Sequence, residues 1–350
     1  MAPATKPWGW VLDRAQAEAW VTDLARAGRE VWAPVDRDGA RVLAPLGAAA
    51  DLKLDAGRTR YSPKEAVFPR TEPLFSYRAT SEGVTLADPP ADTTERVLFA
   101  VRPCDAAGLV RLDAVLAADP FYAARRARTT VVTLGCDEPG PECFCTAVDG
   151  SPHGAEGSDL EMVVAPAGLL VRPLTPKGEA LVAGASAGWT PAQEADWKAA
   201  DERGRAAAAA IAQEPLPREW AGALETSFAS PVWDEIGRRC LSCSVCAYVC
   251  PSCSCFDVQD EANGACGERC RNWDACSFGL FTSHASGHNP RGGQPARYRQ
   301  RLLHKFSYFP ARGHGEWMCV GCGRCVAMCP VGIDIREAVR LVMSERGSHV

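Results

Sequence analysis

A cysteine run that occurs twice is the part of this chain whose residue types and spacing most directly indicate chemistry. The two copies are Cys240-x2-Cys243-x2-Cys246-x3-Cys250-Pro251 and Cys319-x2-Cys322-x2-Cys325-x3-Cys329-Pro330. In each copy, three thiolates lie close enough in sequence to reach three corners of one cubane, while the fourth points to a neighbouring cluster. The runs therefore predict two [4Fe–4S] clusters and electron transfer as their chemistry.

The ligand sets are expected to be shared between the two runs. The first set is Cys240, Cys243, Cys246 and Cys329, and the second set is Cys319, Cys322, Cys325 and Cys250. Bacterial two-cluster ferredoxins use this run, and the proline after it ends the loop. Zinc sites usually combine two separated ligand pairs, and seventeen cysteines are an odd number for complete disulfide pairing. Both alternatives are therefore disfavoured.

A separate group of four cysteines lies upstream, and we name it the upstream set: Cys104, Cys136, Cys143 and Cys145. Cys104 and Cys136 each follow a predicted strand, and the carboxyl ends of parallel strands converge on one crevice. Four thiols can meet there, so we expect a third [4Fe–4S] cluster. Buried structural thiols or a redox pair are the alternatives.

The remaining cysteines are harder to assign. Cys253, Cys255 and Cys276, named here the hairpin set, enclose Cys266 and Cys270 in the sequence. The hairpin set can bind a further metal with a non-cysteine partner, or pack around the cluster pair. The lack of a four-ligand spacing favours packing or support of the clusters. The following basic segment, 281–315, contains no Asp or Glu. Charge balance for anionic clusters is its preferred role, and a docking face or contact with nucleotide phosphates is the alternative.

Periodicity and turn residues indicate which elements hold these cysteines. Helices are expected at residues 13–28, 106–117, 190–213 and 335–345, strands at 95–101 and 129–134, hairpins at 31–46 and 162–172, and an extended loop at 59–76. The strand–helix–strand order predicts a parallel crossover. The expected fold is a mixed α/β domain over residues 1–220, followed by a ferredoxin-like dicluster domain over 221–350. About 68 residues (251–318) are inserted between its two runs.

Composition and missing motifs narrow the function. The 350 residues are 47% apolar with a net charge of −5, which gives no reason to expect a nucleic-acid partner. No apolar stretch approaches about 18 residues, and no secretory leader is evident, so a cytoplasmic protein without a membrane span is expected. No G-x-G-x-x-G follows a strand, and no phosphate loop or hydrolase motif is present. We therefore assign no catalytic residue and no complete catalytic site.

At the level of longer motifs, nearly the whole chain resembles the β subunits of cytoplasmic NAD(P)-linked [NiFe] hydrogenases, the sulfhydrogenases. The motifs are Arg102-Pro103-Cys104-Asp105, Cys136 with Cys143-Phe144-Cys145, Cys250-Pro251-Ser252-Cys253-Ser254-Cys255-Phe256-Asp257, Trp273-Asp274-Ala275-Cys276, Gly287-His288-Asn289-Pro290-Arg291, His304-Lys305-Phe306 and Cys319-Val320-Gly321-Cys322-Gly323-Arg324-Cys325. The electron-transfer subunit of anaerobic sulfite reductase is similar over the same motifs and is the alternative. Cys266 and Cys270 fall outside the motifs.

The resemblance implies an iron–sulfur subunit of a heteromeric oxidoreductase complex. Its partners would be a large subunit with Ni–Fe, a small iron–sulfur subunit, and a third subunit that binds FAD and NAD(P). The chain would relay electrons between the small and the flavin-binding subunits. A stand-alone ferredoxin-like carrier is a further alternative, but such a carrier does not need an N-terminal domain of this length.

Overall fold

The computed structural model describes residues 9–55 and 57–347. Its strands are β1 (Trp10–Leu12), β2 (Glu30–Arg37), β3 (Ala40–Pro45), β4 (Thr71–Thr80), β5 (Gly83–Ala87), β6 (Arg96–Val101), β7 (Thr129–Leu134), β8 (Leu160–Ala165), β9 (Gly168–Pro173), β10 (Thr190–Pro191), β11 (Phe256–Asn263) and β12 (Cys266–Trp273). Its α-helices are α1 (Arg14–Arg26), α2 (Pro103–Leu116), α3 (Pro120–Ala127), α4 (Pro176–Val182), α5 (Glu194–Ala209), α6 (Trp220–Thr226), α7 (Val232–Arg238), α8 (Val245–Tyr248), α9 (Gln294–Leu303), α10 (Arg324–Ala327) and α11 (Ile335–Gly347).

An eight-stranded mixed sheet forms the centre of the N-terminal part. Its strand order is β10-β1-β9-β8-β7-β6-β2-β3. The adjacent strands β2, β6, β7 and β8 run parallel to one another, and the hairpins β2–β3 and β8–β9 are antiparallel. The ladder between β6 and β7 is irregular just after Leu98, where Ala100 adopts a left-handed φ of 57°. This bulge lies directly before the Arg102-Pro103-Cys104 segment and redirects the chain into α2.

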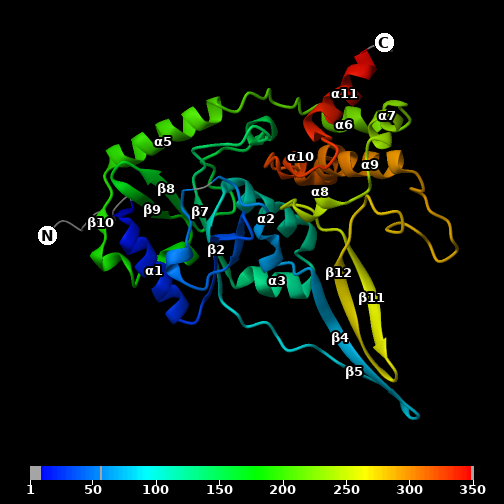
Figure 1. Cartoon of the computed structure of the whole chain (residues 1–350), viewed down its shortest axis with the longest axis horizontal. Helices are drawn as coiled ribbons and strands as arrows, with labels where there is room; N and C mark the ends of the chain where they lie inside the picture. Colours follow the sequence, from blue (N-terminus) through cyan, green and yellow to red (C-terminus); the bar gives the residue numbers. More distant parts are fainter. Residues whose placement is uncertain (1–8, 56, 348–350) are drawn as a thin grey trace.

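The sheet is buried on both faces because its central strands carry apolar residues continuously. Val97 and Phe99 pack with α1 and α4 in one core, whereas Leu98 and Val101 pack with α2 in another. Helix α5 covers a third core near the β8–β9 hairpin. Figure 1 shows this N-terminal part beside the cysteine-rich part, with α5 running along one edge.

A second sheet projects from the molecule as an arm and joins distant parts of the chain. Its order is β11-β12-β4-β5, so strands from residues 71–87 pair with strands from residues 256–273. Figure 1 shows these four strands extending away from the eight-stranded sheet and from the helices. The division of the chain at residues 220 and 221 stays a prediction, and this sheet crosses it.

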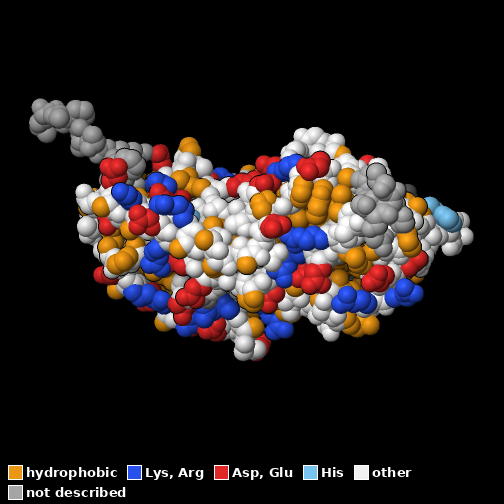
Figure 2. Space-filling model, turned by 90° about the horizontal axis from the view of Figure 1, so that it is seen from above, with side chains coloured by type: hydrophobic (Ala, Val, Ile, Leu, Met, Phe, Trp, Pro, Cys, Tyr) orange, Lys and Arg blue, Asp and Glu red, His pale blue; other side chains and the backbone are white. Residues whose placement is uncertain are grey.

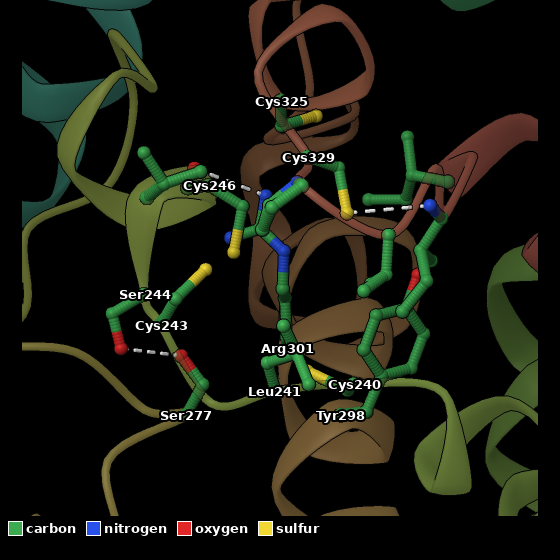
Figure 3. A pocket seen from close by; sticks show the side chains of 15 residues that line it. Cys240, Leu241, Cys243, Ser244, Cys246, Ser277, Tyr298, Arg301, Cys325 and Cys329 are labelled. Atoms are coloured by element: carbon green, nitrogen blue, oxygen red, sulfur yellow. Dashed lines mark hydrogen bonds between the residues drawn. The ribbon is translucent and has the colours of Figure 1, made fainter.

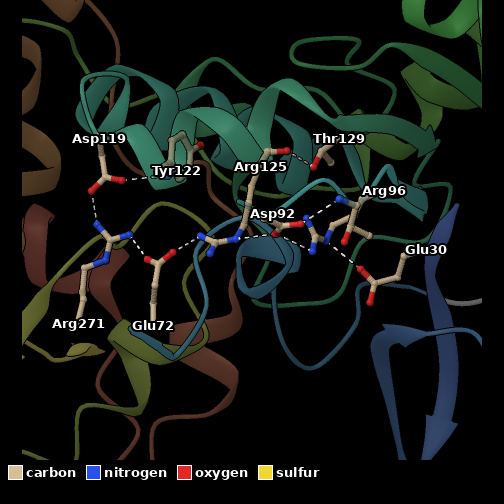
Figure 4. Close-up of polar contacts among 10 residues, drawn as sticks. Glu30, Glu72, Asp92, Arg96, Asp119, Tyr122, Arg125, Thr129 and Arg271 are labelled. Carbon is tan, nitrogen blue, oxygen red and sulfur yellow. Dashed lines mark hydrogen bonds and ion pairs between the residues drawn. The ribbon is translucent and has the colours of Figure 1, made fainter. Parts of the chain in front are cut away.

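A chain of charged side chains ties the base of the arm to the central sheet. Arg271 on β12 pairs with Glu72 on β4 and with Asp119 before α3. Figure 4 shows the series continuing from Glu72 through Arg125 and Asp92. Glu72 and Arg271 are both buried, so removing either one takes a counter-charge from a buried partner and leaves that partner with a single remaining ion pair.

The cysteine-rich part has its own core formed by α6, α7, α9 and α11. Trp233, Leu302, Phe306 and Val339 are among its buried members. Helix α2 approaches this part closely, since a Cβ on Gly108 would lie 2.5 Å from the Cβ of Pro251. Only glycine allows this approach, so the two parts pack directly beside the first cysteine run.

Most of the sequence expectations agree with these elements. The predicted strands at 95–101 and 129–134, the two hairpins, the crossover helix and the last helix are confirmed. The loop expected at 59–76 is wrong in its second half, because β4 begins at Thr71 and pairs with β12. Its polar composition reflects a half-exposed strand whose partner lies far away in sequence.

The distribution of surface charge and the character of the helices relate to the expectations about nucleic-acid binding and a membrane span. Figure 2 shows one face on which Lys and Arg side chains are interspersed with Asp and Glu. Among the helices of residues 9–55 and 57–347, none has the length and apolar character that a membrane span requires.

Candidate iron–sulfur centre

The four cysteines of the first set line a single cavity at the cysteine-rich end of the molecule. The cavity is lined by Cys240, Cys243, Cys246 and Cys329, together with Cys325, Tyr298 and Arg301. Figure 3 shows the cysteines arranged around Arg301, whose guanidinium enters from α9. The side-chain amide of Gln294 donates to Cys240 Sγ at 2.9 Å, and the backbone N–H of Ile333 donates to Cys329 Sγ at 3.2 Å. The expected sharing between the two runs is compatible with this arrangement.

The second set lies deeper in the protein. Cys250, Cys319 and Cys322 are buried, and Cys325 lies in the short helix α10. Burial raises the pKa of the Cys319 thiol to about 12. Lys305 donates from Nζ to Cys250 Sγ at 3.4 Å and to the Ser252 hydroxyl at 3.2 Å. The ammonium group thus lies directly against a proposed ligand.

The upstream set also surrounds one cavity. Cys104, Cys136, Cys143 and Cys145 all line it, together with Arg58, Arg102, Gly321 and Cys322. Cys136 follows β7, and Cys104 follows β6 at the first turn of α2. Both cysteines therefore lie at the carboxyl ends of parallel strands, where they were expected to converge. Burial raises the pKa of Cys145 to about 12.

The upstream set and the second run are in direct contact. The backbone N–H of Phe144 donates to the carbonyl of Gly321 at 2.8 Å. Gly321 has a left-handed φ of 65°, and an added Cβ would lie 2.5 Å from the Cα of Cys145. A side chain at this position would separate the two loops, so glycine allows the upstream set to approach the second set.

A buried ion pair strengthens the same junction. Arg324, within the second run, donates to both carboxylate oxygens of Asp105 at 2.6 and 2.9 Å. Its Nε also donates to the carbonyl of Thr59 at 2.8 Å. Asp105 follows Cys104 directly, so this pair fixes one loop of the upstream set against one loop of the second set.

Two basic residues near the cysteines were not found by sequence analysis. Arg58 donates to Cys143 Sγ at 3.1 Å and to the carbonyl of Cys322 at 3.0 Å. Lys64 donates from Nζ to the carbonyls of Ala247 and Cys253 at 3.0 and 3.1 Å. Both lie in or beside a proline-containing segment without cysteines, so no local pattern marks them. Within the basic segment, Arg301 and Lys305 do lie beside cysteines, as charge balance predicts.

These surroundings suit iron–sulfur clusters better than single metal ions. Among the described residues, no three His, Cys, Asp or Glu side chains are grouped so that they could hold one ion. The four cysteines of the first set line one cavity and the four of the upstream set line another, and four is the number of thiolates that a [4Fe–4S] cluster binds. Thiolates are costly to bury without nearby positive charge, and the adjacent arginine and lysine side chains supply part of it.

Comparison with known proteins is consistent with this geometry. Residues 239–333 match the 4Fe–4S dicluster domain family. The chain is 31% identical to subunit beta of sulfhydrogenase 2 from Pyrococcus furiosus over 315 residues, which cover 89% of this chain and 91% of the relative.

The chain belongs to the family of sulfhydrogenase beta subunits. It is an iron–sulfur electron-transfer protein with two [4Fe–4S] clusters in its dicluster domain. The fold class expected from the sequence, a mixed α/β part followed by a dicluster part, is confirmed. The ligand of each individual iron stays a prediction.

Proposed function

We propose that this chain relays electrons inside a hydrogenase complex. One partner would be the small iron–sulfur subunit that accompanies a Ni–Fe large subunit. The other would be a subunit that binds FAD and NAD(P). The relative from Pyrococcus furiosus is a subunit of a sulfhydrogenase, and the similarity extends over most of both chains. The seventeen cysteines are all free, which supports a reducing, cytoplasmic setting.

The serial arrangement of the cysteine sets is the observation that carries this proposal. Cys322 lines the cavity of the upstream set, and Cys325 lines the cavity of the first set. Both belong to the second set, which therefore lies between the other two. At one end Cys243 is exposed, and at the other Cys136 also lines a separate polar cavity. A relay between two partners needs its terminal clusters near the surface. The first set and the upstream set are the terminal ones in this order, and each reaches an exposed residue or an open cavity.

The upstream set is proposed to hold a third [4Fe–4S] cluster. The test is iron and sulfide analysis of the anaerobically purified chain beside the variant Cys136→Ser. The variant should contain about four irons fewer per chain, because each [4Fe–4S] cluster carries four. Equal iron content in both proteins, with unchanged electron paramagnetic resonance spectra, would show that this set binds no cluster.

The partners are tested by anaerobic affinity purification of the tagged chain from its own cells. Nickel and flavin should co-purify with it in constant ratio. Recovery of a sirohaem subunit instead would assign the chain to sulfite reduction, the alternative that shares the same motifs. Recovery of a monomer that exchanges electrons freely with soluble redox partners would indicate a stand-alone carrier.

A further inference from the structure

Exposed apolar side chains lie close to Cys243, the exposed member of the first set. Leu241 is 65% exposed and precedes this cysteine by two residues. Leu280 is 84% exposed, and its loop is held against the first run because the hydroxyls of Ser244 and Ser277 are hydrogen-bonded at 2.7 Å (Figure 3). Large apolar side chains gathered at the surface are typical of a protein contact. These lie where the first set comes nearest to solvent.

Two arginines come close to the same surface. Arg239, directly after α7, is exposed and donates to a backbone carbonyl just beyond the second run at 3.5 Å. Arg297 donates to the side-chain oxygen of Gln294 at 2.8 Å, and the hydroxyl of Ser242 donates to the same oxygen at 2.6 Å. Because Ser242 belongs to the first run, this shared acceptor holds Arg297 beside Cys243.

A third arginine is placed next to the loop of Leu280. The side-chain amide of Asn289 donates to the carbonyl of Gly279 at 2.6 Å, and its oxygen accepts from the backbone N–H of Arg291 at 2.9 Å. Arg297 also donates to the carbonyl of Arg291 at 3.0 Å. The exposed loop and the basic residues at the start of α9 are therefore held together as one unit.

The charge of these three arginines is not neutralised by carboxylates. In the part of the chain that the structure describes, no ion pair includes Arg239, Arg291 or Arg297. Helix α7 carries Asp234 and Glu235 in its first turn, and these match in number the two arginines at its end. The excess of positive charge comes from the basic segment, which contains no Asp or Glu.

The charge of the first cluster and the charge of the surrounding arginines make opposite demands on a partner. A [4Fe–4S] centre bound by four thiolates is anionic, so by itself it repels an acidic protein. The arginines counter that repulsion, and the exposed leucines provide apolar contact area. Arginine is enriched in protein interfaces, and complementary charge speeds the encounter of two partners. The surface therefore fits a redox protein whose contact face is acidic.

We propose that an acidic redox protein docks over the first set. The docking face consists of exposed and half-buried side chains around Cys243, namely Arg239, Leu241, Leu280, Arg291 and Arg297. This inference rests on the proposed relay function and adds the charge of one partner. One electron passes between a cluster of this chain and a cluster of the partner. One cluster is oxidised and the other reduced, and no bond or proton is transferred.

The test is anaerobic stopped-flow mixing of the dithionite-reduced full chain with an oxidised, acidic [4Fe–4S] ferredoxin. The variant Arg239→Glu/Arg291→Glu should lower the second-order rate constant about tenfold or more at low salt, because electrostatic steering raises such rates by about 10–1000-fold. The matched control is Lys198→Glu/Arg205→Glu, which makes the same change in net charge at two exposed residues of α5. The control should leave the rate constant nearly unchanged. Equal slowing in both variants, or more in the control, overturns the docking face.

The salt dependence of the wild-type chain keeps the proposal testable if the double variant loses its iron. Between about 0.01 M and about 1 M salt, the Debye length falls from about 30 Å to about 3 Å. Over this range the rate constant with the acidic ferredoxin should fall, and the rate constant with a basic cytochrome c should rise. Any other pattern of salt dependence overturns the docking face.

The docking face and the proposed hydrogenase complex can fail separately. Absence of nickel and flavin from the purified complex would contradict the proposed partners, but the stopped-flow comparison would still stand. An unchanged rate constant in Arg239→Glu/Arg291→Glu, with nickel and flavin still co-purifying, would overturn the docking face alone.

Discussion

Replacing Asp105 by Asn should destabilise the junction between the upstream set and the second run. The carboxylate and the Arg324 guanidinium are 2% and 1% exposed and are joined by two hydrogen bonds. Asparagine keeps the size of the side chain but leaves the buried guanidinium without its counter-charge. Breaking a buried pair in this way typically costs about 3–5 kcal/mol. The carbonyl of Thr59 remains as one acceptor, so a value near the lower limit is expected.

The assay is anaerobic thermal unfolding of the holoprotein, followed by circular dichroism. At about 2 °C per kcal/mol for a chain of this size, a cost near the lower limit lowers Tm by about 6 °C. The matched control is Asp260→Asn, which breaks a similar two-bond pair with Arg269 on the arm, where the side chains are 45% and 43% exposed. Solvent screens that surface pair, so Asp260→Asn should lower Tm by at most about 2 °C.

Equal shifts in the two variants would refute the reasoning. In that case the Asp105–Arg324 pair would contribute no more than a solvated ion pair. The variant also leaves a net positive charge beside Cys322 and Cys104. The midpoint potential of at least one cluster should therefore rise, as measured by anaerobic redox titration.

Three further variants test how the cysteine sets are positioned and tuned. Gly321→Ala and Gly332→Ala both place a side chain at a left-handed φ, at about 1–2 kcal/mol, but only Gly321 lacks space for a Cβ. Gly321→Ala should therefore lower Tm further and reduce iron content, whereas equal effects would show that the close contact is unimportant. Lys305→Met removes a cation from the second set and should lower a cluster midpoint potential. Gln294→Leu removes the N–H donor to Cys240 and should lower the potential of a different cluster; titrations in which both variants shift the same signal would contradict the separate ligand sets.

Sequence patterns predicted those elements whose own residues carry a recognisable pattern. The strands at Arg96–Val101 and Thr129–Leu134 are continuous apolar runs, and a central parallel strand needs little more to be recognised. The first half of the arm was missed for the opposite reason. Residues Thr71–Thr80 are polar and half exposed, and they become a strand because β12 pairs with them. No pattern within the segment itself specifies a partner so far away.

Part of the candidate site could also be predicted from the sequence, and part of it could not. Cysteine spacing within each run indicates cluster ligands, because three of the four ligands come from one short loop. The positions of Arg58 and Lys64 depend on tertiary packing, since each reaches cysteine-bearing loops from a distant segment. The hairpin set has no recognisable spacing, because two eight-residue strands separate two of its members from the third.

The antiparallel sheet of the arm also sets the order in which the protein can be made. Strand β4 ends at Thr80, but its partner β12 is complete only at Trp273, 193 residues later (273 − 80). At about 5–20 residues per second, the ribosome leaves the β4–β5 hairpin without that partner for about 10–40 s. The first cysteine run is complete at Cys250 and waits a further 79 residues (329 − 250), about 4–16 s, if Cys329 completes its ligand set. Cluster insertion would then have to wait until nearly the whole chain has been synthesised. A truncated polypeptide would expose both an unpaired strand and reactive thiols.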